Sequence, residues 1–394
     1  MSSLPPTPSG VRPTRKARAS WTTLPLFDFV EPRSKEQRAA NKGCADPNPY
    51  LARLNLFTRE LIDSASLNLI SLFCGGGGLD LGLGFAGFHS LVVSDIAPSF
   101  VDTVTTNLSL ISGLKEDALV LTKEKLCKLA GTNQIDLVAA GPPCQSFSIL
   151  GRRGALSDPR GKLALKYFDL VAAIKPKAFL FENVPGLLNV NKGEDWRRLI
   201  EHAQRTTRYH LHSAKLNAVK FGIPQFRERV FLVGFRENVR FEFPSVATGP
   251  GADGLLHAIA SEGGEGIPSA WALERVEGLP NHDIRQHGSR VRDRYRKLER
   301  GGRDKTDHTD RIDPERPSGT VLVGSAAGGG RPHIHPAEPR VITVREAARL
   351  QSFPDWYVFR GTGTAQYRQI GNAVPPLLAY EVGKKIREAL KKAN

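Results

Sequence analysis

The sequence has few cysteines and no apolar run long enough to cross a membrane. Its 394 residues include four cysteines, Cys44, Cys74, Cys127 and Cys144. Their irregular spacing fits neither a zinc site nor a disulfide framework, so we expect a reducing compartment and no metal. A membrane span needs about 18 or more consecutive apolar residues, and no such run occurs. Residues 1–42 also lack the apolar core of a secretory signal. These absences exclude a transmembrane protein and a disulfide-stabilised secreted domain.

Acidic residues are scarce relative to basic ones. Lys and Arg number 55 against 40 Asp and Glu, which gives a formal net charge of +15. Hydrophobic residues make up 40% and charged residues 24%, which is ordinary for a globular protein. At roughly 150 residues per domain, the length favours two or three domains. A chain this basic favours a polyanionic partner, with nucleic acid first and an anionic membrane surface second.

Residues 1–66 are predicted to form a basic, flexible N-terminal extension. Residues 1–20 are rich in Pro, Ser, Thr and Arg and show no period of a packed helix or strand. Residues 1–42 carry eight Lys or Arg against three acids. Both a solvated tail and an electrostatic arm along DNA agree with this composition.

The sequence pattern changes at residue 67, where short apolar runs begin to alternate with stretches of helical period. This alternation predicts a parallel α/β sheet covered on both faces, in a main domain over residues 67–244; the motifs described below make it the candidate catalytic and cofactor-binding domain. Residues 245–312 are rich in Gly, Arg and Asp and read as an inserted module. Residues 313–394 return to the main domain, with helices expected at 344–350 and 377–390. The predicted strands are 67–73, 91–93, 135–140, 178–181 and 229–235.

The first candidate ligand site is the glycine-rich segment 73–78, between a predicted strand and a helix. Such a turn lets a ligand approach the backbone closely. The next predicted strand ends in Asp95, where α/β folds place a ribose-binding carboxylate. No Gly-Lys-Ser/Thr follows the glycines, so a nucleoside without a pyrophosphate, such as S-adenosylmethionine, fits better than ATP or NAD. The glycines alone would also agree with a tight turn that binds nothing.

The segment 141–148 follows the third predicted strand and holds a candidate nucleophile. Pro142 and Pro143 make a rigid loop at the carboxyl edge of the sheet, the usual place for an α/β active site. They present Cys144, whose thiolate would be a strong nucleophile. A buried structural cysteine is the alternative interpretation.

Charged residues follow the next two predicted strands. Glu182 comes directly after a buried apolar run, a costly position for a carboxylate that is neither paired nor functional. Arg227 and Arg229 lie two residues apart on one face of the fifth strand and could hold a carboxylate or phosphate. A solvated pair of arginines would give the same pattern.

Taken together, these motifs strongly resemble the DNA (cytosine-5)-methyltransferases. The resemblance covers residues 67–244 and 313–390, and leaves the N-terminal extension and residues 245–312 uncovered. The matching stretches are 72–82, 141–148, 158–161, 182–184, 225–229, 343–354 and 369–376. A cysteine after the two prolines, where amino-methyltransferases place an aromatic residue, favours methylation at carbon.

The resemblance implies a catalytic set of Cys144, Glu182, Arg227 and Arg229. Cys144 would add to C6 of a cytosine flipped out of the duplex, which makes C5 nucleophilic. Glu182 would contact N3 and the exocyclic amine, and Arg229 would hold the ring while Arg227 orients nearby groups. The loop after the cysteine would close behind the base, with Arg152 and Arg153 contacting phosphates.

The resemblance also implies an S-adenosylmethionine site. Asp95 would bind the ribose and Ile96 would pack on the adenine, although the family more often has the longer Glu at the first position. Asp117 would accept from the adenine amine. The expected cofactor-binding residues are Phe73, Gly75, Gly77, Asp95, Ile96, Asp117, Pro142, Leu163, Asn372 and Val374.

Residues 245–312 occupy the place of the family's variable target-recognition region. Residues 285–305 contain nine Lys or Arg and three acids, a net charge of +6. We expect phosphate contacts there, with one or two arginines reading guanine edges, although a solvated charged helix would look the same. The candidate DNA-binding residues of this region are Arg290, Arg292, Arg294 and Arg296.

The favoured function is a bacterial-type DNA cytosine methyltransferase, most simply the modification partner of a restriction endonuclease. We expect a monomer that acts on double-stranded DNA in the cytoplasm, associated with the nucleoid. Two alternatives stay open: a transfer-RNA cytosine-5 methyltransferase on the same scaffold, and a catalytically silent DNA-binding regulator. The arginine-rich insert and the residues after Cys144 favour DNA over RNA.

Overall fold

The computed structural model of the protein describes residues 48–143, 161–253, 255, 266–322 and 332–393. Seven described strands form a sheet in the order β3-β2-β1-β4-β5-β7-β6. The strands are β1 Leu67–Leu72, β2 Phe88–Asp95, β3 Ser112–Lys115, β4 Leu137–Ala140, β5 Ala178–Asn183, β6 His210–Asn217 and β7 Glu228–Phe235. The described α-helices are α2 Pro49–Leu56, α3 Arg59–Asp63, α4 Gly78–Phe85, α5 Pro98–Asn107, α6 Lys123–Ala130, α7 Gly161–Ile174, α8 Glu194–Thr207, α10 Ala270–Leu273, α11 Ser289–Lys297, α12 Val344–Leu350, α13 Gly363–Asn372 and α14 Pro376–Ala393. Short 3-10 helices are η2 Ala118–Val120, η5 Pro185–Leu188, η6 Val190–Gly193 and η7 Ala218–Phe221.

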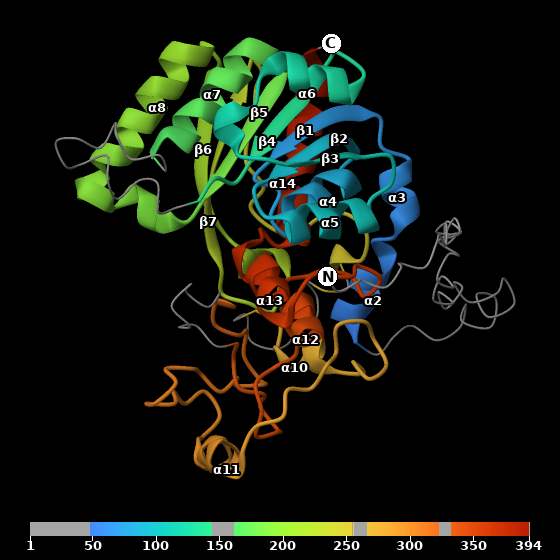
Figure 1. Cartoon of the computed structure of the whole chain (residues 1–394), viewed down its shortest axis with the longest axis vertical. Helices are drawn as coiled ribbons and strands as arrows, with labels where there is room; N and C mark the ends of the chain where they lie inside the picture. The colour runs from blue at the N-terminus through green and yellow to red at the C-terminus, as the bar shows by residue number, and fades with distance from the viewer. Residues whose placement is uncertain (1–47, 144–160, 254, 256–265, 323–331, 394) are drawn as a thin grey trace, which may run out of the picture. The chain divides into compact units, whose positions relative to one another are not determined.

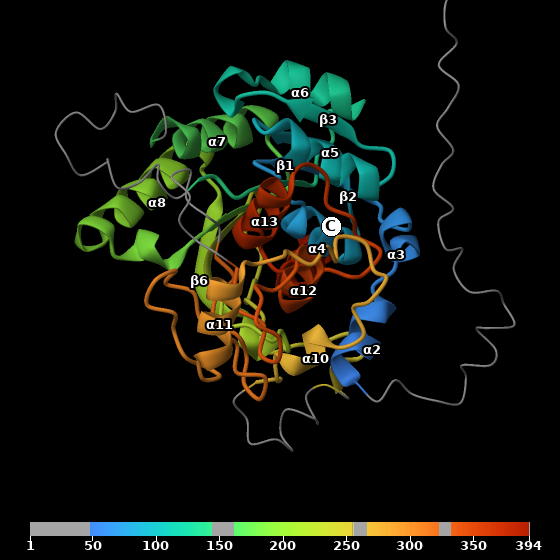
Figure 2. The same ribbon diagram turned by 60° about the horizontal axis from the view of Figure 1, so that its bottom comes forward.

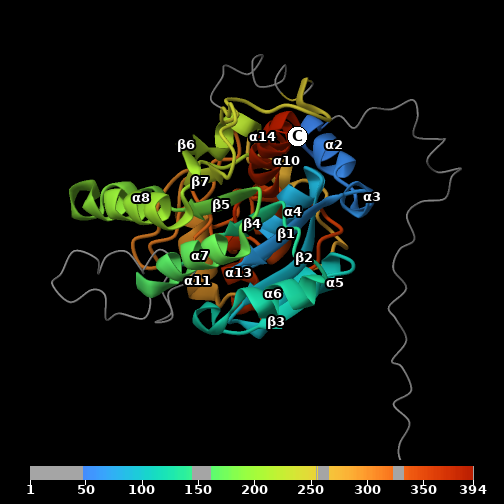
Figure 3. The same cartoon turned by 90° about the horizontal axis from the view of Figure 1, so that it is seen from above.

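The central strands are mostly apolar because helices cover both faces of the sheet (Figures 1 and 3). Every residue of β4 and β5 is buried. Helices α4, α5, α12, α13 and α14 contribute to the core on one face, together with Leu69 and Val93. Helices α6, α7 and α8 contribute to the core on the other face, with Ile70 and Val138. This three-layer arrangement confirms the predicted α/β fold class.

The sheet is mixed rather than wholly parallel, which corrects the prediction for residues 229–235. Pairs among β1 to β5 are parallel, whereas β7 is antiparallel to both β5 and β6. The connection from β6 to β7, residues 218–227, holds only the 3-10 helix η7. A parallel return needs a crossover of about a dozen residues or more, usually with a full helix. The short connection therefore places β7 antiparallel.

The helices predicted near the C-terminus are present as α12 and α14. Helix α12 begins with a capping box: the Glu346 amide donates to Thr343 Oγ1 at 3.2 Å, and the Thr343 amide donates to Glu346 Oε2 at 2.6 Å. These bonds satisfy two backbone donors that a helix start leaves without partners. Within the described residues, no helix is both long and apolar enough to span a membrane.

The folded unit begins before the predicted boundary at residue 66. Helix α2 is capped by Asn48, whose side chain accepts from the amides of Tyr50 and Leu51, both at 3.1 Å. Tyr50, Leu51 and Leu54 are buried in the core that covers one face of the sheet. Residues 48–63 are thus packed structure rather than extension, since their apolar side chains have a core to join. Residues 1–47 lie outside the described part of the chain.

A buried ion pair joins α2 to the C-terminal helix α14. Arg53 is fully buried and donates to Glu381 Oε1 at 3.2 Å and to the Phe221 carbonyl at 2.9 Å. Glu381 also accepts from the amide of Thr248 at 2.7 Å. Burial lowers the pKa of Arg53, and the nearby Glu381 opposes that shift. Helix α2 is therefore tied to the core by polar as well as apolar contacts.

Substitution Arg53→Ala should destabilise the protein by about 3–5 kcal/mol, because it leaves Glu381 buried without its main countercharge. The free energy of unfolding in urea measures this loss. Arg240→Ala is the matched control, since Arg240 is 89% exposed and pairs with Glu242 on the surface; we expect a change below about 0.5 kcal/mol. Equal stability of the two variants would contradict the structural role of α2.

Candidate active site

The glycine-rich turn after β1 has a strained backbone with one open side. Phe73, Gly75 and Gly77 all have positive φ, at 55°, 54° and 78°. A Cβ atom on Gly75 would meet no heavy atom within 4 Å, so a ligand can approach there. A Cβ on Gly77 would stand 2.3 Å from the Tyr357 hydroxyl. Gly77 is therefore buried and required for packing, and its contact with the cofactor stays a prediction.

Asp95 is braced beside this turn. Its Oδ2 accepts from the Gly75 amide at 3.0 Å and its Oδ1 from the Ala97 amide at 2.9 Å. Burial raises the pKa of Asp95, and these two bonds oppose the shift. The next residue, Ile96, is 70% exposed at the end of β2. A fixed carboxylate next to an exposed apolar side chain suits a nucleoside, with its ribose on the acid and its base on Ile96.

The other predicted cofactor-binding residues differ in how far they are exposed to solvent. Asp117, Leu163 and Asn372 are at least partly exposed, and the Asp117 carboxylate accepts from the Leu119 amide at 2.9 Å. Pro142 and Val374 are buried. The Asn372 segment ends helix α13, which lies beside α4 (Figure 2).

The start of α4 favours a cationic ligand group over a phosphate. Asp80 lies in the first turn of α4, where an anionic ligand would otherwise be stabilised by the helix. Burial raises the pKa of Asp80 to about 6, and the Ser90 hydroxyl donates to its carboxyl group at 3.3 Å. A carboxylate there disfavours a pyrophosphate. The residues present therefore fit S-adenosylmethionine, which carries a sulfonium and an amino group but no phosphate.

Glu182 and Arg229 form a buried ion pair at the carboxyl end of β5. Arg229 Nε lies 2.8 Å from Glu182 Oε1, and both side chains are less than 10% exposed. Burial raises the pKa of Glu182, and this outweighs the opposing effects of Arg229 and Arg227. The carboxyl group can thus hold a proton at a higher pH than a glutamate in water.

The backbone before Cys144 is fixed against this pair. Asn183 Nδ2 donates to the Pro142 carbonyl at 2.9 Å. A Cβ atom on Gly141 would stand 2.9 Å from Glu182 Oε2. Residues 141–142 therefore pass directly beside the Glu182 carboxyl group. Cys144, Arg152 and Arg153 themselves lie outside the described residues.

Arg227 does not share the role of Arg229. Its guanidinium is fully buried and donates to the carbonyls of Gly371 at 2.6 Å and Ala373 at 2.8 Å. Burial lowers the pKa of Arg227, and the neighbouring Arg229 lowers it further. The two carbonyls flank Asn372, so Arg227 holds the cofactor-side segment, and only Arg229 pairs with the carboxylate.

Sequence reasoning missed several residues that support the site. Tyr357 Oη donates to the Gly76 carbonyl at 2.9 Å from 281 residues away. Gln225 is buried and joins the strand start to two distant segments, through the Leu350 carbonyl at 3.1 Å and the Val321 amide at 2.9 Å. Contacts this far apart in sequence have no local signal, although the asparagine after Glu182 could have suggested the Asn183 bond.

The arginines of α11 differ in exposure and in their partners. Arg290, Arg292 and Arg296 are exposed. Arg294 is half-buried, with its Nε 2.6 Å from Asp304 Oδ2 and a second ion pair to Asp307. Arg294 therefore cross-links this region internally, and the structure does not favour it as a DNA contact.

Fold and site together define a class: an α/β methyltransferase that uses a nucleoside methyl donor and carries a buried carboxyl group at its catalytic edge. Comparison with known proteins specifies the family. A model of the C-5 cytosine-specific DNA methylase family matches residues 67–388. The chain belongs to this family of S-adenosylmethionine-dependent enzymes and is a DNA cytosine-5 methyltransferase.

Similar proteins cover most of the chain. Type II methyltransferase M1.HphI of Haemophilus parahaemolyticus is 33% identical over 354 residues, 86% of this chain and 90% of that protein. Type II methyltransferase M.XorII of Xanthomonas oryzae pv. oryzae is 35% identical over 370 residues, which cover 82% of this chain and 85% of that protein.

Solved structures show the same fold. A prophage-encoded E. coli protein, described as a DNA modification methyltransferase, aligns with a TM-score of 0.64 at 27% identity, over 83% of this chain and all of that one. The Dnmt2 methyltransferase of S. pombe aligns with a TM-score of 0.60 over 84% of this chain and all of that one. At 21% identity, it shows likeness of fold alone.

Substitution Gly141→Ala should lower the methylation rate roughly 10²-fold, because the added methyl group displaces the Glu182 carboxyl group from its pairing with Arg229. Single-turnover methylation of DNA measures the rate. Gly186→Ala is the matched control, since a Cβ there meets nothing within 4 Å, and we expect a change below about twofold. A Gly141→Ala enzyme as fast as this control would contradict the proposed crowding.

Substitution Arg227→Lys should weaken S-adenosylmethionine binding by roughly tenfold or more, because one ammonium cannot replace both bonds to the carbonyls around Asn372. Calorimetric titration of cofactor and of DNA separates the effects. We expect a DNA Kd within about twofold of the parent, since no DNA group is involved. Equal losses for the two ligands, or none for the cofactor, would show that Arg227 does not position the cofactor segment.

Proposed function

We propose that the protein methylates carbon 5 of a flipped-out cytosine within one short sequence of double-stranded DNA, with Cys144 as the covalent nucleophile. The observation that carries this proposal is the buried Glu182–Arg229 pair, pressed against the backbone that leads into Cys144. A buried acid with a raised pKa beside a candidate nucleophile is the arrangement expected of a catalytic centre.

The reaction begins with activation of the cytosine ring. Carbon 5 is a poor nucleophile until the Cys144 thiolate adds to C6 and forms a carbon–sulfur bond. C5 then carries enamine-like electron density and takes up the methyl group that S-adenosylmethionine supplies. Loss of the C5 proton to a base breaks the carbon–sulfur bond by elimination and releases Cys144.

Glu182 assists the addition step by placing a proton on the ring. Its pKa is raised by burial, so the protonated carboxyl group persists to a higher pH than in a free glutamate. Donation to N3 removes electron density from C6 and favours thiolate attack. Arg229, paired with the same carboxyl group at 2.8 Å, fixes the orientation of that group, and in this proposal it also holds the carbonyl oxygen O2 of the cytosine.

DNA binding is assigned to the inserted region, residues 245–312. Arg290, Arg292 and Arg296 are exposed within a stretch of net charge +6, and we propose that they contact phosphates. For Arg152 and Arg153 we keep the proposal that they contact phosphates when the loop after Cys144 closes behind the flipped base. Arg294 is left out because its guanidinium is paired with two carboxylates.

The biological setting is proposed from the relatives, which are named Type II methyltransferases. We infer that the protein is the modification enzyme of a restriction–modification system, with a cognate endonuclease as a functional partner. It would act as a monomer on nucleoid DNA in the cytoplasm, because flipping one base at a time requires a single catalytic domain.

Expression in a methylation-free host, followed by bisulfite sequencing, tests this function. The parent protein should place 5-methylcytosine in one short sequence context. Cys144→Ala should leave that context unmethylated, since no adduct at C6 can form.

Three other results would each change the assignment. Methylation by Cys144→Ala would contradict the nucleophile. Methylated transfer RNA without methylated DNA would favour the RNA enzyme. S-adenosylmethionine binding without any methylation would favour a silent DNA-binding regulator.

A further inference from the structure

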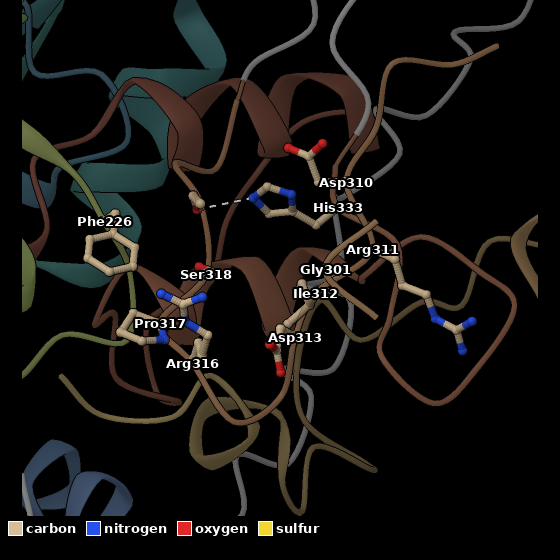
Figure 4. Close-up of a pocket in the computed structure, with 11 residues that line it drawn as sticks. Phe226, Gly301, Asp310, Arg311, Ile312, Asp313, Arg316, Pro317, Ser318 and His333 are labelled. Carbon is tan, nitrogen blue, oxygen red and sulfur yellow. Dashed lines mark hydrogen bonds between the residues drawn. The ribbon is translucent and has the colours of Figure 1, made fainter. Parts of the chain in front are cut away.

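A pocket of about 230 Å³ lies where the start of β7 meets the inserted region (Figure 4). One wall is the ring of Phe226, from the same segment as Arg227 and Arg229. The opposite side is formed by residues of the inserted region and of the chain that follows it. The residues that line the pocket include Phe226, Asp310, Asp313, Arg316, Gly319 and His333.

Phe226 is exposed although both of its neighbours are buried. Its side chain is 39% exposed, whereas Gln225 and Arg227 are fully buried. Side chains alternate between faces along an extended chain, so Phe226 points away from the face on which Arg227 contacts the cofactor segment. Packing of the core does not account for a phenylalanine here, which leaves its ring available to a ligand.

The walls of the pocket are held in place by hydrogen bonds. The Phe226 amide donates to the Ser318 carbonyl at 2.8 Å, and Thr320 Oγ1 donates to the Phe226 carbonyl at 2.7 Å. His333 Nε2 lies 3.1 Å from the Gly319 carbonyl. The aromatic ring is therefore presented on a fixed backbone, which reduces the entropy that a ligand would otherwise lose on ordering it.

The polar lining selects a type of ligand. Asp310 and Asp313 border the pocket, and Asp310 Oδ1 is also 3.1 Å from Arg303. Carboxylates accept hydrogen bonds from the amino and ring N–H groups of a nucleobase, and Arg316, which also lines the pocket, can donate to the ring nitrogens and carbonyl groups of a base. A flat aromatic ring is the usual stacking surface for an unstacked base. The pocket thus combines a stacking surface with hydrogen-bond acceptors and donors.

We propose that this pocket receives a nucleobase of the substrate DNA other than the target cytosine, stacked on Phe226 and bonded to the carboxylates. This inference rests on the proposed function and extends it to sequence readout. Phe226 precedes Arg229 by three residues, so their side chains leave opposite faces of the extended segment. A base stacked on Phe226 is therefore a different base from the cytosine that Arg229 would hold.

A library of DNA duplexes with randomised bases around the methylated cytosine tests the proposal by sequencing the methylated products. Phe226→Ala should relax the preference at one flanking position by roughly tenfold and leave the other positions unchanged. Phe226→Tyr should retain the preference, because a tyrosine ring stacks equally well. Leu110→Ala is the matched control, since Leu110 is 88% exposed and does not line the pocket, and it should keep the parent preference.

Each outcome has one meaning. Relaxation at a single position by Phe226→Ala but not by Phe226→Tyr supports the proposal. An unchanged preference, or an equal loss of rate on all sequences, overturns it. Thermal unfolding and S-adenosylmethionine binding show whether the variant is folded, and Asp313→Asn provides a second test at the same position. Failure of the parent protein to methylate any duplex would instead contradict the proposed function itself.

Discussion

The contact between the glycine-rich turn and residues 371–376 is the constraint on which the site depends. A Cβ on Gly78 would stand 2.2 Å from the Val374 carbonyl, and one on Gly82 would stand 2.3 Å from the Pro376 carbonyl. Only glycines allow the first helix after β1 and the C-terminal return to approach this closely. The approach sets Asn372 beside the turn that carries Gly75. A cofactor site made from two ends of the sequence is thereby formed by backbone packing.

Buried arginines fix this arrangement by binding carbonyl groups rather than acids. Arg345 donates to the carbonyls of Pro280, Pro354 and Tyr357 at 2.9, 3.1 and 2.6 Å, and burial lowers its pKa to about 10. Tyr357 in turn donates to Gly76, while Arg227 holds the carbonyls on both sides of Asn372. Because Arg227 directs its hydrogen bonds to backbone carbonyls, Arg229 is the guanidinium that pairs with Glu182. A carboxyl group and a guanidinium thus lie together at the carboxyl end of β5, where burial raises the pKa of the carboxyl group.

Elements with a distinctive local residue pattern could be predicted from the sequence. Elements whose position or direction depends on contacts with distant parts of the chain were missed. Strands β1, β4 and β5 are rich in apolar residues, and the motif residues Asp95 and Glu182 lie at or next to the ends of their strands as expected. Edge strand β6 was missed because its residues are mostly polar and half-exposed, and the direction of β7 follows from a connection length that composition does not reveal. Helix α2 was assigned to the extension because its flanking residues are polar and proline-rich, although Asn48 and Pro49 are ordinary helix-start signals. The resemblance gave Arg227 and Arg229 separate roles, but the bonds of Arg227 to the Gly371 and Ala373 carbonyls could not be predicted, because those partners lie more than 140 residues away in the sequence.

The inserted region shows why arginine content alone does not locate a DNA surface. Among the described residues, the small core beside α11 joins Tyr295 of the inserted region to Ile334 and Val341 of the chain that follows it, and three buried apolar side chains are too few to fix α11 by apolar burial alone. Ion pairs of Arg294 with Asp304 and Asp307, and the bonds of Arg311 to the Tyr295, Leu298 and Pro336 carbonyls, supply further cross-links. Arginines used in this way are removed from the set that can reach DNA. The exposed arginines of α11 remain the ones proposed to bind phosphates. Base readout needs a surface whose shape is fixed, and Phe226 lies in the short segment that leads into β7, the strand that carries Arg229.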